Sequence, residues 1–236
     1  MLFSLNRNTR FKRFLNWSKD IHAHLIPGID DGPETMEESL LIIENLGNLG
    51  YKELTATPHV FHDYYPNTKE DILAKLGVLQ REVEKADISV KINSGAEYFL
   101  DYHFESLLES SSLLTVFDNF ILVEMSTFES PPYLYDILEK IKEKGYRPIL
   151  AHPERYLFLG ERDYLKLLQF GCTFQLNILS ISTFYGREIQ KRAIFLLKKN
   201  WVHYLGTDIH KKEQLAFLEP LIQTNLDQSA LHRFLQ

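Results

Sequence analysis

The sequence predicts an α/β protein with a parallel sheet of about seven strands, closed into a barrel. The first observation is that stretches of helical spacing alternate with short apolar stretches along the whole chain, as in βα units. The second is that histidines and carboxylates directly follow almost every apolar stretch. A barrel brings all its strand ends to one mouth, so this pattern favours closure over the competing architecture, an open doubly wound sheet.

The elements in the first half of the chain follow from local patterns. Residues 21–25 are apolar enough for a strand, and residues 35–49 carry apolar side chains at helical spacing with glutamates on the other side. Gly50 follows at the position where many helices end. Asn67 or Thr68 can cap the next helix. The elements expected after residue 50 are a strand at 53–57, a helix at 68–86, and strands at 88–94 and 120–124.

The second half of the chain repeats the alternation. Two of its helices stop at Gly145 and Gly171, because glycine readily adopts the left-handed conformation that follows many helices. Strand 148–151 is apolar enough to be buried on both faces, as parallel strands are. The expected elements are strands at 148–151, 173–177 and 203–207, and helices at 131–144, 161–170, 188–199 and from 212 onward.

The chain is long enough for one large domain with a substantial core. It contains no Pro/Ser-rich linker and no repeat, so a single domain is expected over residues 17–236, after a basic arm at residues 1–16. Apolar and basic residues are interleaved in this arm. That pattern leaves two interpretations open, a contact with a membrane or partner, and a packed or frayed terminus with solvated charges.

The composition excludes several functional classes. A net charge of −6 argues against nucleic acid as the main partner, because phosphate backbones require a basic face. The single cysteine, Cys172, excludes an internal disulfide framework and fits a reducing compartment. No apolar run is long enough to span a membrane, and no secretory signal is evident. We therefore expect a cytoplasmic protein, peripheral at the inner face of the membrane if the basic arm binds there.

The segment DIHAH, residues 20–24, is the most informative part of the chain. Its histidines are one residue apart, so both imidazoles lie on the same face of a strand. Two carboxylates, Asp30 and Asp31, follow after a Pro-Gly break. Histidine with carboxylate and without cysteine suits Mn, Fe or Zn rather than a thiolate-rich structural zinc site. The candidate ligands are His22, His24 and Asp31, and after later strands His59, Glu97, Glu124, His152, Asp208 and His210.

The four remaining histidines have a different interpretation. A lone buried histidine is more often a hydrogen-bonded core residue than a metal ligand. We expect this role for His62, His103, His203 and His232.

Seven short motifs occur in a fixed order: DIHAHLIPGIDDG, ATPHV, SGAEYFLD, LVEMS, AHPERY, FQLN and GTDIHK. Together they extend from residue 20 to residue 211. This set resembles the PHP superfamily (polymerase and histidinol phosphatase), and more narrowly the bacterial tyrosine-protein phosphatases encoded with capsule and exopolysaccharide genes. Carboxylates at Asp31 and Glu124, where other PHP branches more often have histidine, favour the narrower resemblance. It implies an α/β fold of the PHP type, a distorted (β/α)7 barrel, with two or three divalent metal ions, Mn before Fe or Zn.

The resemblance also assigns ligands to individual metals. The first metal would be held by His22, His24, Glu97 and Asp208. Glu97 would bridge to the second, which is completed by Glu124 and His152. The third would be held by Asp31, His59 and His210. Asp30 is the alternative to Asp31 and otherwise a supporting residue of the catalytic site. Residues that depart from the family pattern are Thr207, Ile209 and Lys211.

Arg155 is the candidate phosphate-binding residue. It lies three residues after His152, where the family pattern has an arginine, and its guanidinium can bind phosphate as a planar fork. The alternative is a surface ion pair with Glu154 or Glu161. Three divalent ions would outweigh the charge of four carboxylates, which suits an anionic substrate. Cys172 has no phosphate-binding loop, so we expect a small buried residue there and not a nucleophile.

These features predict metal-dependent hydrolysis of phosphotyrosine on proteins. A bridging water would attack phosphorus, and a tyrosinate with a pKa of about 10 leaves with little help from an acid. The expected substrate is the tyrosine-rich tail of a membrane-associated bacterial tyrosine kinase, and the expected result is regulation of capsular or exopolysaccharide synthesis. Two rivals stay open, a PHP phosphoesterase for a small metabolite phosphate and a PHP module that binds a partner without turnover.

Aromatic residues near the mouth could stack on the ring of a phosphotyrosine, or they could pack in the core. They are Phe61, Tyr64, Tyr65, Tyr98, Phe99 and those of an expected rim loop at 179–187.

Overall fold

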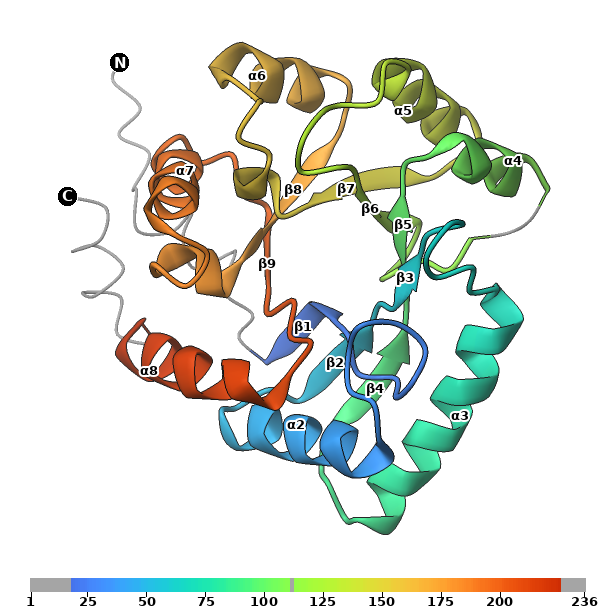
Figure 1. The fold of residues 1–236 in the computed structure, drawn as a ribbon, viewed down its shortest axis with the longest axis vertical. Coiled ribbons are helices and arrows are strands. Elements are labelled where there is room, and N and C mark those ends of the chain that lie inside the picture. Colours follow the sequence, from blue (N-terminus) through green and yellow to red (C-terminus); the bar gives the residue numbers. More distant parts are fainter. Residues whose placement is uncertain (1–17, 111–112, 226–236) are drawn as a thin grey trace, which may run out of the picture.

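The computed structural model of the chain describes residues 18–110 and 113–225 (Figure 1). Within these residues every strand of the two sheets pairs in parallel with its neighbours. One sheet has the order β1 (Lys19–Ala23), β2 (Glu53–Ala56), β4 (Lys91–Ser94). The other has the order β3 (His59–Val60), β5 (Glu97–Phe99), β6 (Phe120–Glu124), β7 (Arg147–Ala151), β8 (Thr173–Asn177), β9 (Tyr204–Gly206).

The two sheets are continuous on one side because two chain segments each contribute a strand to both. Only two residues separate β2 from β3, and two separate β4 from β5. Backbone bonds bridge this interruption: the Gly95 amide donates to the Ala56 carbonyl at 2.9 Å, and the Glu97 amide donates to the Pro58 carbonyl at 3.1 Å. A Cβ on Gly95 would lie 3.0 Å from three neighbouring side chains, so glycine permits this close approach.

On the other side, backbone bonds join the ends of β1 and β9. The Asp208 amide donates to the His22 carbonyl at 2.8 Å, and the His24 amide donates to the Ile209 carbonyl at 3.0 Å. β1 and β9 therefore lie side by side (Figure 1). The predicted α/β class with parallel strands is confirmed, and the finer description as a (β/α)7 barrel stays a prediction at this point.

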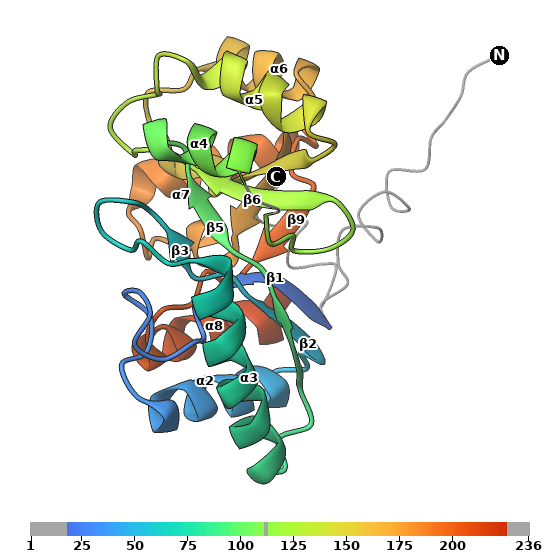
Figure 2. The same cartoon turned by 90° about the vertical axis from the view of Figure 1, so that its right-hand side faces the viewer.

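The helices lie outside the strands in Figure 1. Thr68 caps one of them as predicted: its Oγ1 accepts the Asp71 amide at 3.1 Å, and the Asp71 carboxylate accepts the Thr68 amide at 3.3 Å. Figure 2 shows that the loops after β1, β3 and β6 project from the same side of the molecule. The helices are α2 (Met36–Asn48), α3 (Lys69–Lys85), α4 (Tyr102–Ser110), α5 (Leu134–Glu143), α6 (Glu161–Gln169), α7 (Arg187–Lys198) and α8 (Leu215–Asn225).

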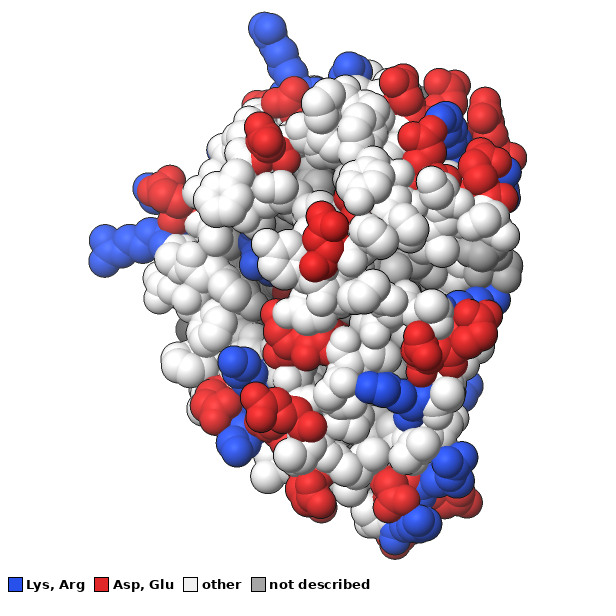
Figure 3. All heavy atoms as spheres, turned by 45° about the vertical axis from the view of Figure 1, so that its right-hand side comes forward, with Lys and Arg blue, Asp and Glu red and all other residues white. Residues whose placement is uncertain are grey.

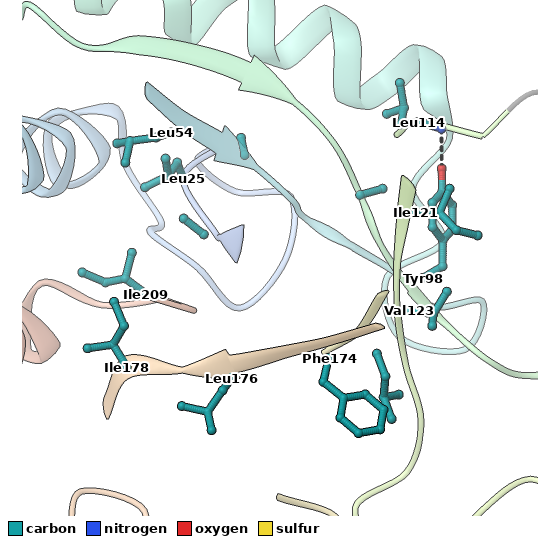
Figure 4. Close-up of a cluster of buried hydrophobic side chains, with 14 of the residues drawn as sticks. Leu25, Leu54, Tyr98, Leu114, Ile121, Val123, Phe174, Leu176, Ile178 and Ile209 are labelled. Atoms are coloured by element: carbon teal, nitrogen blue, oxygen red, sulfur yellow. Dashed lines mark hydrogen bonds between the residues drawn. The ribbon is translucent and has the colours of Figure 1, made fainter. Parts of the chain in front are cut away.

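The core is built from the apolar strands and the inner faces of the helices. Figure 4 shows part of it, in which Leu25, Leu54 and Phe174 are each 0% exposed. Removing such side chains from water is the main favourable contribution to folding. The Tyr98 hydroxyl accepts the Leu114 amide at 2.7 Å, so this tyrosine is a buried core residue and not a ring at the mouth.

Most predicted elements are present, with ends shifted by a few residues. Strands 120–124 and 173–177 coincide with β6 and β8. The sequence analysis missed β3, β5 and α4. The predicted basic arm at residues 1–16 lies outside the described residues.

The predicted core role of the four remaining histidines is partly wrong. His62 and His103 are exposed and stack on one another, with ring centroids 4.1 Å apart. Partly buried His203 accepts the Phe174 amide at Nδ1 at 3.2 Å, which agrees with the prediction. His232 lies outside the described residues.

Candidate metal centre

The nine candidate ligands lie together at the carboxyl ends of the parallel strands. Parallel strands present these ends at one edge, so residues far apart in the sequence can meet there. They form three groups, and within each group all donor atoms lie within 4.8 Å of one another. The first group is His22, His24, Glu97 and Asp208; the second is His59, Glu97 and Glu124; the third is His24, Asp31, His59 and His210. His152 adjoins them, because its Nε2 lies 3.0 Å from Glu97 Oε1.

The first group is almost fully buried, with no member more than 2% exposed. Nε2 of His22 lies 3.2 Å from Glu97 Oε2 and 3.2 Å from Asp208 Oδ1. Nε2 of His24 lies 3.3 Å and 3.5 Å from the same two oxygens. Donors about 2.0–2.1 Å from a tetrahedral metal ion are about 3.3–3.4 Å apart, so these four donors fit one ion.

The Glu97 carboxylate also faces a second group. His59 Nδ1 lies 3.2 Å from Glu97 Oε2 and 2.9 Å from Glu124 Oε1. His152 Nε2 lies 3.0 Å from Glu97 Oε1 and 3.8 Å from Glu124 Oε2. Glu97 therefore lies between the first and second groups, in the place where a bridging ligand would lie.

The third group is nearest the surface. Asp31 Oδ1 lies 3.4 Å from Nε2 of His59 and 3.4 Å from Nε2 of His210, and the Asp31 side chain is 53% exposed. The His59 ring thus faces the second group with Nδ1 and the third group with Nε2. The family resemblance placed His59 in the third group alone.

The backbone is left-handed at two candidate ligands. φ is 34° at His152, directly after β7, and 50° at Asp208, just beyond β9. This conformation costs a non-glycine residue about 1–2 kcal/mol. The strain occurs where the chain turns a side chain into the site, as is common at functional positions.

Three histidines present Nε2 to the site because hydrogen bonds outside the site hold Nδ1. His22 Nδ1 donates to Gln175 Oε1 at 2.7 Å, and His24 Nδ1 donates to Asp30 Oδ2 at 2.7 Å. His210 Nδ1 donates to a backbone carbonyl two residues earlier at 2.9 Å. Partners of this kind fix the tautomer and the orientation of a metal-binding imidazole.

Asp30 and Asp31 have different surroundings. The Asp30 side chain is 1% exposed, and besides His24 it accepts the Gly32 amide at 3.0 Å and the His59 amide at 3.1 Å. Asp30 therefore fixes the orientation of the His24 ring and bonds the backbone at Gly32 and His59. Asp31 faces the histidines of the third group, so the two carboxylates do not share one role.

Two residues of β8 complete the network, and the sequence analysis did not propose them. Gln175 Nε2 donates to Asn177 Oδ1 at 2.9 Å, and Asn177 Nδ2 donates to Asp208 Oδ2 at 2.5 Å. With the bond from His22 to Gln175, they link His22 to Asp208 through β8. The signal lay in the FQLN motif, where these two side chains are two residues apart and so lie on one face of a strand.

A second network ties β1 to β9. Thr207 Oγ1 donates to Asp20 Oδ2 at 2.5 Å, and the Thr207 amide donates to Asp20 Oδ1 at 3.2 Å. The His22 amide donates to Asp20 Oδ1 at 3.1 Å. Burial raises the pKa of Asp20 to about 6 although these donors lower it. Thr207, larger than the family pattern expects, thus supplies a hydroxyl donor to a buried carboxyl group.

The electrostatics of the site favour cations. Burial alone would lower the pKa of His22, but the carboxylates of Glu97 and Asp208 raise it to about 9. Burial would raise the pKa of Glu97, but His22 and His59 hold it well below its usual value. Protons and metal ions compete for the same lone pairs, so a site that attracts protons this strongly suits divalent cations.

Unpaired polar atoms point to the same conclusion. Within the described part of the chain, the buried atoms without a hydrogen-bond partner include His59 Nδ1, Glu97 Oε2 and Asp208 Oδ1. Buried polar atoms are rarely left unpaired in proteins. These three atoms all belong to the donor groups, so the residues present fit bound metal ions.

A cavity of about 600 Å³ lies over the donor groups and is lined by all candidate ligands except the two histidines of the DIHAH segment. Arg155 also lines it, and its Nη1 lies 3.4 Å from Asp208 Oδ2. The alternative partner Glu161 pairs instead with Lys199. Arg155 is therefore directed to the site, with 31% of its side chain exposed.

Cys172 is a buried residue, 2% exposed, and it does not line this cavity. Burial raises the pKa of its thiol to about 12. The nucleophilic thiolate is therefore scarce near neutral pH. Both findings agree with the predicted role as a small apolar residue.

Comparison with known proteins places the chain in a family. Residues 18–226 match the family model described as capsular polysaccharide synthesis, CpsB/CapC. The chain belongs to this family. Tyrosine-protein phosphatase CpsB of Streptococcus pneumoniae is 31% identical over 201 residues, which cover 81% of this chain and 82% of the relative. Tyrosine-protein phosphatase YwqE of Bacillus subtilis (strain 168) is 27% identical over 201 residues, which cover 84% and 79%. These CpsB/CapC relatives are enzymes.

Solved structures share the CpsB/CapC fold of this chain. A structure described as belonging to YwqE from Bacillus subtilis and CpsB from Streptococcus pneumoniae, "unique metal-dependent tyrosine phosphatases", has a TM-score of 0.78 at 23% identity and covers 92% of this chain and 95% of that one. A lactonase from Listeria monocytogenes has a TM-score of 0.52 at 11% identity, with coverage of 92% and 90%. Among the helices of residues 18–110 and 113–225, none is long and apolar enough to cross a membrane.

Proposed function

We propose that this chain is a metal-dependent phosphatase that hydrolyses phosphotyrosine on proteins. The observation that carries the proposal is that candidate metal ligands, Arg155 and aromatic side chains line the same cavity. Divalent metals and arginine suit the oxygens of a phosphate, and aromatic side chains suit the ring that carries it. The names of the curated relatives CpsB and YwqE support the same substrate class.

Two or three divalent metal ions fit the donors, and we propose Mn, with Fe or Zn as alternatives, because imidazole and carboxylate without thiolate suit all three. When bound, these ions would supply Lewis-acid stabilisation and an activated water for attack on phosphorus. The residues that would hold them are His22, His24, Glu97 and Asp208 for the first, Glu97, Glu124 and His152 for the second, and Asp31, His59 and His210 for the third.

The chain's own residues bind and orient the phosphate. The Arg155 guanidinium donates to phosphoryl oxygens and stabilises their charge as the bond to tyrosine breaks. Asp208 accepts from Arg155 Nη1 and from Asn177, so this network sets the position of the guanidinium. Asp30 acts through His24, as a positioning residue. The tyrosinate leaving group has a pKa of about 10 and therefore departs without a strong general acid.

The proposed partner is the tyrosine-rich tail of a membrane-associated bacterial tyrosine kinase, met in the cytoplasm, with regulation of capsular or exopolysaccharide synthesis as the result. The family description, capsular polysaccharide synthesis, supports this setting. On the face drawn in Figure 3, the basic residues are scattered among acidic ones, which supports a protein partner over nucleic acid.

We also propose that the two sheets form one distorted (β/α)7 barrel. The nine strands found in residues 18–110 and 113–225 fall into seven chain segments, because β2 with β3 and β4 with β5 are each interrupted by only two residues. Backbone bonds across both junctions between the sheets support this description.

The substrate class is tested with three probes on the full chain reconstituted with Mn. A phosphotyrosine peptide should have a far higher kcat/KM than a phosphoserine peptide of the same sequence or a sugar phosphate. A higher kcat/KM on the sugar phosphate would favour a metabolite phosphoesterase. Bound metal without turnover of any probe would favour a binding module.

The role of Arg155 is tested in the same assay. Arg155→Ala should keep its metal content and melting temperature but lose about 2–4 kcal/mol of transition-state stabilisation, because one charge-assisted contact in a water-poor site is removed. Arg155→Lys retains the charge but not the planar fork, and it should recover part of the loss. Unchanged kcat/KM in Arg155→Ala would contradict the assignment.

A further inference from the structure

Aromatic side chains also line the cavity over the donor groups. Phe184 and Tyr185 contribute to it from the loop between β8 and α7, and Phe217 contributes from α8, which follows β9. We call these three residues the aromatic wall. They share a cavity with the metal-type donors because β8 and β9 are adjacent parallel strands, so the segments that follow them leave the same edge of the sheet.

Phe184 and Phe217 form an exposed pair within the aromatic wall. Their ring centroids are 5.0 Å apart, with 63° between the planes. They are 37% and 53% exposed, so neither ring is taken up by the core. Apolar rings that line a cavity beside a few convergent polar groups are typical of a ligand-binding site.

Other aromatic residues near the mouth already have partners for their faces. Phe61 stacks on Phe99, with centroids 4.0 Å apart and 9° between the planes. Tyr65 stacks on His59 at 5.5 Å and 14°. Among the described residues that line the cavity, neither Phe61 nor Tyr65 is present. The aromatic wall is therefore the better candidate for a substrate contact.

Tyr185 connects the aromatic wall to the phosphate-binding side. The Arg155 Cζ lies 5.4 Å from the centre of the Tyr185 ring, within the range of a cation–π contact. Phe184 packs edge-on against Tyr185 at 4.8 Å and 89°. Arg155 Nη1 also lies 3.4 Å from Asp208 Oδ2, so the guanidinium has both an aromatic and a carboxylate neighbour.

We propose that Phe184 and Phe217 bind the aryl ring of the substrate and that Tyr185 positions Arg155 toward the phosphate. The inference rests on the proposed phosphotyrosine hydrolysis and names the residues that select an aryl ester. A phosphotyrosine ring against the wall excludes water from apolar surface, whereas a short alkyl phosphate leaves that surface wet. Selection thus comes from contact with the ring, because the candidate ligands and Arg155 would contact the phosphate group that all these esters share.

The ring contact is tested with Phe184→Ala and Phe217→Ala in the Mn-loaded full chain. Each should raise KM for a phosphotyrosine peptide about tenfold, because an aromatic pair and its buried area are lost. The inhibition constant of inorganic phosphate, which has no ring, should stay within twofold. Phe217→Tyr keeps an aromatic face and should restore KM. The matched control is Phe128→Ala, since Phe128 is 89% exposed on the loop after β6 and does not line the cavity.

The positioning role is tested with two variants of Tyr185. Tyr185→Leu should lower kcat about tenfold and weaken inhibition by inorganic phosphate, because Arg155 loses its aromatic face. Tyr185→Phe keeps that face and should restore both values. Metal content should be the same in both variants.

Three results would overturn the proposal. They are an unchanged KM in Phe184→Ala and Phe217→Ala, an equal rise of KM in Phe128→Ala, and no difference between Tyr185→Leu and Tyr185→Phe. A wild-type protein that does not cleave phosphotyrosine would instead contradict the proposed function, so the two failures can be told apart.

Discussion

Residues outside the donor groups decide which nitrogen of His22 and of His24 faces the site. His22 and His24 both turn Nε2 inward, yet Nδ1 is held by an amide oxygen in one case and a carboxylate in the other. The amide oxygen of Gln175 can only accept, so the proton on Nδ1 of His22 is fixed. The structure therefore keeps the proton on Nδ1, so Nε2 is the nitrogen that can lose its proton and bind a metal ion.

Gln175→Leu should weaken metal binding while the chain stays folded. Leucine removes the acceptor for His22 and the donor to Asn177, and loss of such a partner lowers metal affinity about 10–100-fold. Competition with a chromogenic chelator measures this change. The matched control is Gln190→Leu, because the Gln190 side chain donates to the backbone carbonyl of Ile181 and not to a candidate ligand. Equal affinity in both variants would contradict the role given to Gln175.

Cys172→Ala should keep kcat/KM within about twofold, because the thiol is buried and its pKa is raised to about 12. A thiol with a raised pKa stays protonated until the pH approaches that value. Alkylation of the native protein should therefore be slow at neutral pH and become fast only after denaturation. Mass spectrometry after timed alkylation checks this, and rapid loss of activity on alkylation of folded protein would argue for a reactive thiol.

At this scale, the sequence could identify residue types at strand ends but not the direction of each side chain. The spacing of His22 and His24 was informative because a strand has a fixed period. Asp30 and Asp31 are adjacent in a loop that turns at Gly28, where φ is 62°, so no period tells which one faces the site. The geometry of the turn decides which carboxylate faces the site: Asp30 bonds His24, and Asp31 faces His210.

At the scale of elements, one buried carboxyl group adds to the backbone bonds that join the segments of β1 and β9. Asp20 is 2% exposed and accepts hydrogen bonds from the Thr207 hydroxyl and from two backbone amides. The hydroxyl is the only side-chain donor among these three. This hydroxyl bond links the β1 segment, which carries His22, to the segment after β9, which carries Asp208.

Thr207→Val should lower the free energy of unfolding by about 1–3 kcal/mol, because a buried acceptor loses its hydroxyl donor while the volume is conserved. The matched control is Thr173→Val, since the Thr173 hydroxyl donates to the Pro148 carbonyl at 3.2 Å in a neighbouring pair of strands. That change should cost about 1 kcal/mol or less. Urea denaturation of both variants measures the difference, and an equal loss would show that Asp20 has no special need of Thr207.

Elements were predictable from sequence where their apolar pattern is continuous. β6 and β8 were found with their ends because each is a run of five residues between clear breaks. β3 has two residues and β5 has three, too few to show a period of their own. These strands form because they continue the pairing of β2 with β4 across the junction of the sheets, which is tertiary information.

At the scale of the whole molecule, the site draws on nearly the full length of the chain. His22 and His24 come from the first strand segment, and Asp208 and His210 follow the last strand. The order of motifs was therefore the strongest sequence signal, since each motif closes one strand. No motif indicates that the two sheets also join at β1 and β9. The backbone bonds between these two segments make that junction.

Removal of metal should lower the melting temperature of the whole protein. Ions that bind only the folded chain stabilise it by mass action, by about 4 kcal/mol at a thousandfold excess over Kd. Without them, only the neighbouring histidines balance the charge of the buried carboxylates of Glu97 and Asp208. Calorimetry with and without a chelator, followed by addition of Mn, measures the fall and its recovery. An unchanged melting temperature in the presence of the chelator would contradict metal binding at this site.

The pairing of β1 with the segment after β9 has a consequence for synthesis of the protein. A nascent chain that has left the ribosome only as far as residue 200 contains His22 and His24, but neither Asp208 nor His210. Its first group of donors lacks Asp208, and β1 has no β9 to lie against. Unfinished or prematurely ended chains thus lack the assembled centre. The four donors of the first group can therefore meet only after the segment that follows β9 has been made.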